Sequence, residues 1–153
     1  MYAFKLQAVL DHRRFLEDNL KKELSAVRRQ LTEARQTLRR LEEKETMTTA
    51  ELKREQKHGL ASNQVATYHT YFIRLAERIA EQRRLIEAIN EQVSQKQHEL
   101  QEAMKRRQIL DKLKEQGMER YHRELLKEEM QFIDEIAVNR YARQIVETRG
   151  GDQ

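Results

Sequence analysis

The chain has 153 residues, of which 30 are Lys or Arg and 26 are Asp or Glu, so that its net charge is +4. It contains four Gly and no Pro, Cys or Trp, and its mean hydropathy is −0.97. This composition excludes an all-β fold, whose turns need Gly and Pro, and it excludes disulfides, thiolate metal sites and thiol nucleophiles. Apolar residues that recur among strong helix formers predict long helices or a coiled coil.

The first predicted helix covers about residues 4–57 and carries a seam of residues three or four positions apart. The seam consists of Leu16, Leu20, Leu24, Val27, Leu31, Ala34, Leu38, Leu41, Glu45, Thr48 and Leu52. Alternating steps of three and four keep such residues on one side of a helix and are typical of a coiled coil. The two successive steps of four at its start, which run from Leu16 to Leu24, predict a stutter.

A turn is predicted at residues 58–62. Gly59 is the only Gly in the first 116 residues, and it suits the left-handed conformation that closes a helix. Ser62 or Asn63 then offers an N-cap for the next helix. Because the loop is short, the two helices are expected to be antiparallel neighbours.

The second predicted helix covers about residues 63–147, followed by a frayed tail at 148–153. Its seam consists of Val65, Tyr68, Phe72, Leu75, Ile79, Gln82, Ile86, Ile89, Val93, Lys96, Leu100, Ala103, Arg107 and Leu110. The polar members Gln82, Lys96 and Arg107 cost stability but can set the register of the two helices. Gly117 is either a flaw or a mild hinge, and we expect an uninterrupted or slightly bent helix there.

The predicted fold is therefore all-α: one long antiparallel coiled-coil hairpin of two helices with unequal arms. Pairing the seams outward from the turn leaves about 30 C-terminal residues of the second helix without an internal partner. These residues still include Tyr121, Leu125, Phe132, Ile133 and Ile136. An apolar stripe of this kind predicts an external partner.

Catalytic and ligand-binding motifs are missing from the sequence. The five His residues form no H-E-x-x-H pattern, and the nucleophile-elbow, P-loop and dinucleotide-binding patterns do not occur. A two-helix coiled coil also offers no concave, water-excluding pocket. We therefore expect no enzyme activity, no metal and no cofactor.

Charge and hydropathy also limit the partners. Short basic clusters such as Arg28-Arg29 and Lys105-Arg106-Arg107 are flanked by acids, which indicates a solvated face and not the basic stripe of a nucleic-acid-binding protein. No segment approaches the roughly 20 apolar residues of a membrane span, and the N-terminus has no secretory signal. We expect a soluble cytoplasmic protein that binds no nucleic acid and does not insert into a membrane.

Three segments resemble the FliJ family of flagellar type III export proteins. The start, residues 4–14 (FKLQAVLDHRR), is similar to the family's opening, and the turn at residues 59–63 (GLASN), followed by Tyr68 and Phe72, is similar to its hairpin tip. Residues 128–140 (EEMQFIDEIAVNR) resemble its closing E-x-x-x-x-D-E-x-A-x-x-R pattern. The order and spacing of these segments extend the resemblance over the whole chain.

The resemblance implies a non-catalytic stalk similar to the central stalk of rotary ATPases. Such a stalk inserts into the hexameric ring of the flagellar export ATPase, contacts the cytoplasmic domain of the membrane export gate and helps to recycle export chaperones. It would be cytoplasmic, peripherally associated with the inner-membrane export apparatus, and needed for flagellum assembly, motility and chemotaxis.

Two groups of residues are expected to contact these partners. A tip patch for the export gate consists of Leu41, Tyr71 and Leu75. The second group, for the ATPase ring, consists of Leu125, Phe132, Ile133 and Ile136, which would bury against the ring, and Asp134, Glu135 and Arg140, which would make polar register contacts.

Three alternatives remain open from the sequence. The chain is also compatible with the equivalent stalk of a virulence type III injectisome. It is compatible with a self-associating coiled-coil scaffold and, less readily, with a basic coiled coil that binds nucleic acid. Salt-sensitive binding would indicate the last of these.

Overall fold

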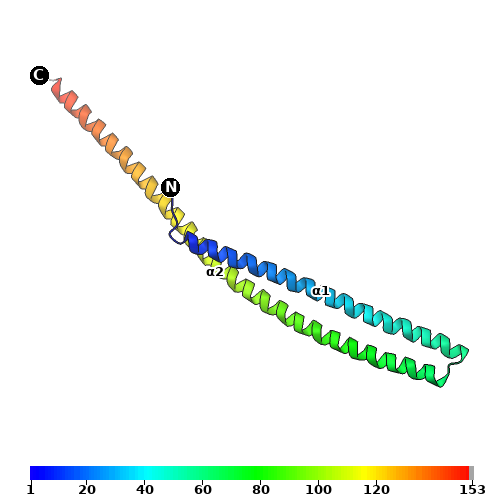
Figure 1. Cartoon of the computed structure of the whole chain (residues 1–153). Coiled ribbons are helices and arrows are strands. Elements are labelled where there is room, and N and C mark those ends of the chain that lie inside the picture. Colours follow the sequence, from blue (N-terminus) through cyan, green and yellow to red (C-terminus); the bar gives the residue numbers. More distant parts are fainter. Residues whose placement is uncertain (152–153) are drawn as a thin grey trace. The chain divides into compact units, whose positions relative to one another are not determined.

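Two helices make up almost the whole chain in the computed structural model, which describes residues 1–151 (Figure 1). Helix α1 runs from Gln7 to His58 and α2 from Ser62 to Gly150. The prediction of an all-α fold with two long helices and a longer second arm is confirmed. Helix α1 begins at Gln7 instead of near residue 4, and α2 continues to Gly150, beyond the predicted end near residue 147. Asp152 and Gln153 of the predicted frayed tail lie outside the described residues.

The chain divides into two compact units, each of which contains parts of both helices. The hairpin unit is Arg14–Met104, with the turn between α1 and α2 at its tip. The terminal unit joins Met1–Arg13 to the chain from Lys105 onward.

The turn of the hairpin unit has the predicted glycine but a different helix start. Gly59 has a φ of +88°, which L-residues with a Cβ rarely adopt. Helix α2 is capped at Ala61, whose carbonyl accepts hydrogen bonds from the amides of Gln64 and Val65. The Gln64 side chain in turn accepts a bond from the Ala61 amide at 3.2 Å, as in half of a capping box. The predicted caps Ser62 and Asn63 are therefore wrong by one or two positions, because Gln64 supplies the capping contact.

The core of the hairpin unit follows the predicted seams. Leu31, Ala34 and Ile89 are buried together, and partly buried Val27, Ile86 and Val93 pack against them. Buried Leu24, Leu75 and Ile79 belong to the same two seams. Because a strip this narrow buries little area, each such side chain contributes a large share of the stability.

The predicted stutter is wrong, because Glu17 and not Leu16 occupies the seam. Glu17 is 3% exposed, whereas Leu16 is only half-buried. Through Glu17 the steps to Leu20 and Leu24 are three and four, so the heptad spacing is unbroken. The Glu17 carboxylate lies 3.4 Å from the Nζ of Lys21, one turn further along α1, so its charge is partly balanced on its own helix.

Two of the predicted polar seam residues bond across the hairpin. Gln82 Nε2 donates to the carbonyl oxygen of Ala34 at 2.9 Å. Lys96 Nζ donates to the carboxylates of Glu23 at 2.8 Å and Glu99 at 3.4 Å. The Lys96–Glu99 bond lies within α2, whereas the Gln82–Ala34 and Lys96–Glu23 bonds each join one position on α1 to one on α2. These two bonds therefore fix the register of the helices.

The carboxylates around Lys96 also change its ionisation. Hydrogen bonds to Glu23 and then Glu99 raise the pKa of Lys96 above its ordinary value of 10.5. The contact therefore contributes fully below about pH 10.5 and is lost as the pH rises through the higher pKa of the folded state.

In the terminal unit, the extended N-terminal segment lies on α2 (Figure 1). The ring centroids of Tyr2 and Tyr121 are 5.8 Å apart, and the N-terminal ammonium donates to the Tyr121 hydroxyl at 3.0 Å. The Tyr2 hydroxyl occupies the space where a Cβ on Gly117 would lie. Helix α2 continues through Gly117 without a break, so this glycine is a notch for Tyr2 and does not end the helix.

Candidate interaction surfaces

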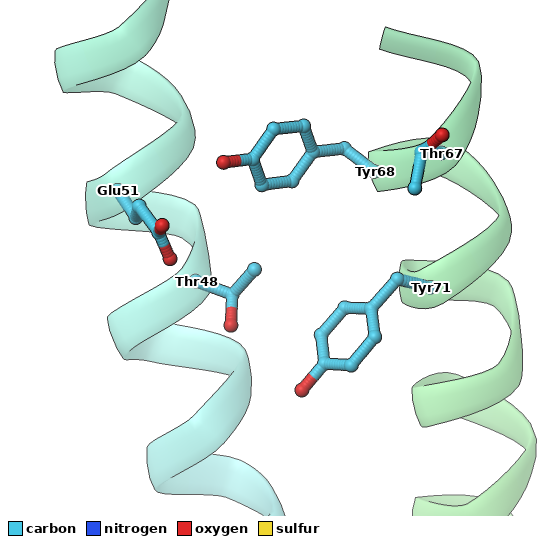
Figure 2. A pocket seen from close by; sticks show the side chains of 5 residues that line it. All are labelled: Thr48, Glu51, Thr67, Tyr68 and Tyr71. Carbon is cyan, nitrogen blue, oxygen red and sulfur yellow. The ribbon is translucent and has the colours of Figure 1, made fainter. Parts of the chain in front are cut away.

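A shallow pocket of about 350 Å³ lies between the helices near the tip of the hairpin unit (Figure 2). Thr48 and Glu51 of α1 and Thr67, Tyr68 and Tyr71 of α2 line it. Figure 2 shows both tyrosine rings directed from α2 toward α1, with Thr48 facing them from the other side. We call these five residues the tip pocket.

The acidic side of the tip pocket affects Tyr68. Burial, the negative charges of Glu51 and Glu55 and a hydrogen bond to Glu51 raise the pKa of Tyr68 above its ordinary value of 10.0. The phenol therefore stays protonated at neutral pH and donates its one hydrogen to Glu51.

Thr67 supplies apolar surface to the tip pocket. Its hydroxyl donates to the carbonyl oxygen of Asn63 at 2.9 Å. Because this hydroxyl is satisfied within α2, the methyl group of Thr67 is left for other contacts. Together with Tyr71, it suits an apolar side chain of a partner, while Glu51 suits a donor or a cation beside it.

The predicted tip patch is only partly at the surface. Tyr71 is 40% exposed and stacks edge-on against Phe72, with ring centroids 6.1 Å apart. Leu41 is half-buried, and Leu75 is 3% exposed. Leu75 therefore belongs to the hairpin core, and the accessible surface around Tyr71 comes from Thr48, Thr67 and Tyr68 instead.

The second surface is the C-terminal arm, which we define as residues 122–150 of α2. All of its residues except half-buried Ile145 are exposed. Its large apolar side chains are 38–70% exposed, and they are Leu125, Leu126, Met130, Phe132, Ile133, Ile136, Val138, Tyr141 and Val146. So many exposed apolar side chains on one helix are typical of a binding surface.

Most of these side chains share one side of the arm. At about 100° per residue, Leu126, Met130, Ile133 and Ile136 fall within a band of roughly 120°. Arg140 lies seven residues after Ile133 and therefore falls within this band. Glu135 lies about 160° from the centre of the band, on the opposite face. Of the predicted polar contacts, Arg140 is the one that shares the apolar face.

No group of three or more His, Asp or Glu side chains within residues 1–151 is placed to hold a metal ion. No helix in this part of the chain is both long and apolar enough to span a membrane.

The chain that carries these two surfaces also matches a known protein family. A model of the flagellar FliJ protein matches residues 2–145. The chain belongs to the FliJ family. It is thus a coiled-coil protein associated with flagellar protein export. Searches of curated proteins and of solved structures gave no match.

The sequence analysis did not predict that the N-terminal segment packs against α2. Tyr2 and Tyr121 are separated by more than a hundred residues, and no periodic pattern connects Tyr2 with Gly117. The one available signal was a glycine inside a long helix, which marks a close approach by another group as often as a bend. Of the tip-pocket threonines, Thr48 is a member of the first predicted seam, whereas Thr67 lies off both seams and no pattern in the sequence indicates it.

Proposed function

We propose that this FliJ-family chain is a non-catalytic stalk of the flagellar export apparatus. Its C-terminal arm inserts into the ring of the export ATPase, and its tip pocket contacts the cytoplasmic domain of the export gate. The stalk thereby couples ATP hydrolysis to export and assists the recycling of export chaperones. It acts at the cytoplasmic face of the membrane, as a peripheral component needed for flagellum assembly, motility and chemotaxis.

The observation that carries this proposal is the exposed apolar face of the C-terminal arm. Helix–groove recognition uses apolar anchors at spacings of three, four and seven residues. Leu126, Met130, Ile133 and Ile136 are exposed at such spacings. Arg140 adds a cation on the same face, where it can pair with an acidic group of the ring.

The arm is tested by measuring how variants bind the purified export ATPase and stimulate it. Phe132→Ala together with Ile133→Ala removes two of the large exposed side chains expected to bury against the ring. We therefore expect binding at least about tenfold weaker and a matching loss of stimulation. Gln131→Ala is the matched control, since Gln131 lies on the opposite, polar face. Wild-type binding by the double variant would exclude the arm as the ring-binding element.

The flagellar system is favoured over a virulence injectisome because the matching family is a flagellar one. The two systems are separated by complementation. A flagellar stalk restores swimming to a strain that lacks its own FliJ protein, whereas an injectisome stalk does not.

A further inference from the structure

The charges of the C-terminal arm are unevenly distributed along its length. Residues 122–136 contain two basic and five acidic residues, a net charge of −3. Residues 137–151 contain three basic residues and one acidic residue, a net charge of +2. The change of sign falls next to Ile136, in the middle of the arm.

This distribution makes the arm complementary to itself in one orientation. In an antiparallel pair of arms, the acidic half of each copy lies against the basic half of the other. In a parallel pair, like charges would oppose each other and destabilise the contact. A two-fold axis near Ile136 gives every contact twice, as a closed dimer requires.

The apolar face of the arm supplies the other requirement for such a pair. Leu126, Met130 and Ile133 lie on the acidic half and are at least 59% exposed. Tyr141, 66% exposed, lies on the basic half about 20° outside the apolar band. Ile136, 39% exposed, lies where the two arms would cross. The arm has 29 residues, which is about four heptads.

We propose that, when no other partner is bound, the C-terminal arms of two copies of this chain pair antiparallel about an axis near Ile136. The pairing covers the apolar face that the chain otherwise exposes. It goes beyond the proposed stalk function, because the occupant is a second copy and not the ATPase ring. Since both occupants use one face, pairing and ring binding exclude each other.

The test is the concentration dependence of the mass of the full-length chain, measured by sedimentation equilibrium without the ATPase. The wild type is expected to convert from monomer to dimer with rising concentration. Glu128→Lys with Glu129→Lys makes both halves of the arm positive, and Arg140→Glu with Arg143→Glu makes both negative. Each of these variants is expected to require at least about tenfold more protein to dimerise. A chain with all four substitutions has opposite charges again and is expected to dimerise like the wild type.

The position of the axis is tested by crosslinking, which is simplified by the absence of native cysteine. Ile136→Cys places two thiols across the proposed axis and is expected to form a disulfide-linked dimer on mild oxidation. Leu126→Cys is the matched control, because in the antiparallel pair residue 126 of one copy would lie far from residue 126 of the other. Circular dichroism verifies that every variant keeps the helix content of the wild type.

Three results would overturn the pairing: a wild type that stays monomeric, double variants that dimerise as well as the wild type, or a fourfold variant that stays monomeric. These measurements contain no ATPase, so their outcome is independent of the proposed stalk function. Loss of ring binding by Phe132→Ala with Ile133→Ala would still support the stalk if the pairing failed.

Discussion

Gly117 shows how a single missing side chain can position another part of the chain. In an exposed helix interior, Gly costs about 1 kcal/mol relative to Ala. Here the hydroxyl of Tyr2 lies where a Cβ would be, and the ring of Tyr2 packs beside Tyr121. We expect the gain in free energy from this docking to offset the helix cost of the glycine.

A double-mutant cycle separates the two effects at Gly117. In a Tyr2→Ala background, the notch is empty, so Gly117→Ala should raise the melting temperature by about 2–4 °C through helix propensity alone. In the wild-type background, the added methyl displaces Tyr2, and the same substitution should give no increase or a decrease. Thermal melts followed by circular dichroism measure both. Equal shifts in the two backgrounds would show that the notch contributes nothing.

Glu17 explains why part of the core was not predictable from its residue types. At the start of α1, hydrophobicity favours Leu16 over its charged neighbour Glu17 as the seam residue. The structure keeps the steps of three and four unbroken and buries Glu17 instead. Geometric regularity of the helix pair thus outweighed the cost of burying a carboxylate beside Lys21. In a coiled coil, spacing is a better guide to burial than hydrophobicity at any one position.

At the scale of the helices, the sequence predicted the two seams well because a heptad repeat fixes which side of each helix is buried. It predicted the turn because only one glycine interrupts the first 116 residues. The sequence did not predict the tip pocket, since Tyr68 and Thr48 are brought together only by the register of α1 and α2. That register depends on contacts such as Gln82 with Ala34, which no single-helix pattern contains.

The contact between Gln82 and Ala34 is expected to favour one register of α1 and α2 at a cost in stability. The carbonyl of Ala34 lies inside α1, where it also accepts a helical hydrogen bond, so removing Gln82 leaves no buried group unsatisfied. Gln82→Leu should therefore stabilise the chain by about 1 kcal/mol and raise the melting temperature by about 2–4 °C. Gln95→Leu, on the exposed face of α2, is the control and should change little. A lower melting temperature for Gln82→Leu would mean that the hydrogen bond outweighs the added apolar contact.

At the scale of the whole molecule, the two proposed partner surfaces belong to different units. The tip pocket lies in the hairpin unit, and the C-terminal arm lies in the terminal unit. Substitutions outside the seams remove contact surface without removing core, so their effects should stay within their own unit. The two binding activities of the stalk are therefore expected to be separable.

Tyr71→Ala tests this separation at the tip. It removes the exposed ring of the tip pocket while leaving Leu75 and the rest of the seam in place, so we expect the melting temperature to change by less than about 3 °C. Binding to the export-gate domain should weaken by about tenfold, as for the loss of an aromatic anchor, while ATPase-ring binding stays at the wild-type level. Ile73→Ala is the matched control, because Ile73 is similarly exposed but lies on the side of α2 away from the pocket. Unchanged gate affinity for Tyr71→Ala, or an equal loss for Ile73→Ala, would rule out the tip pocket as the gate contact.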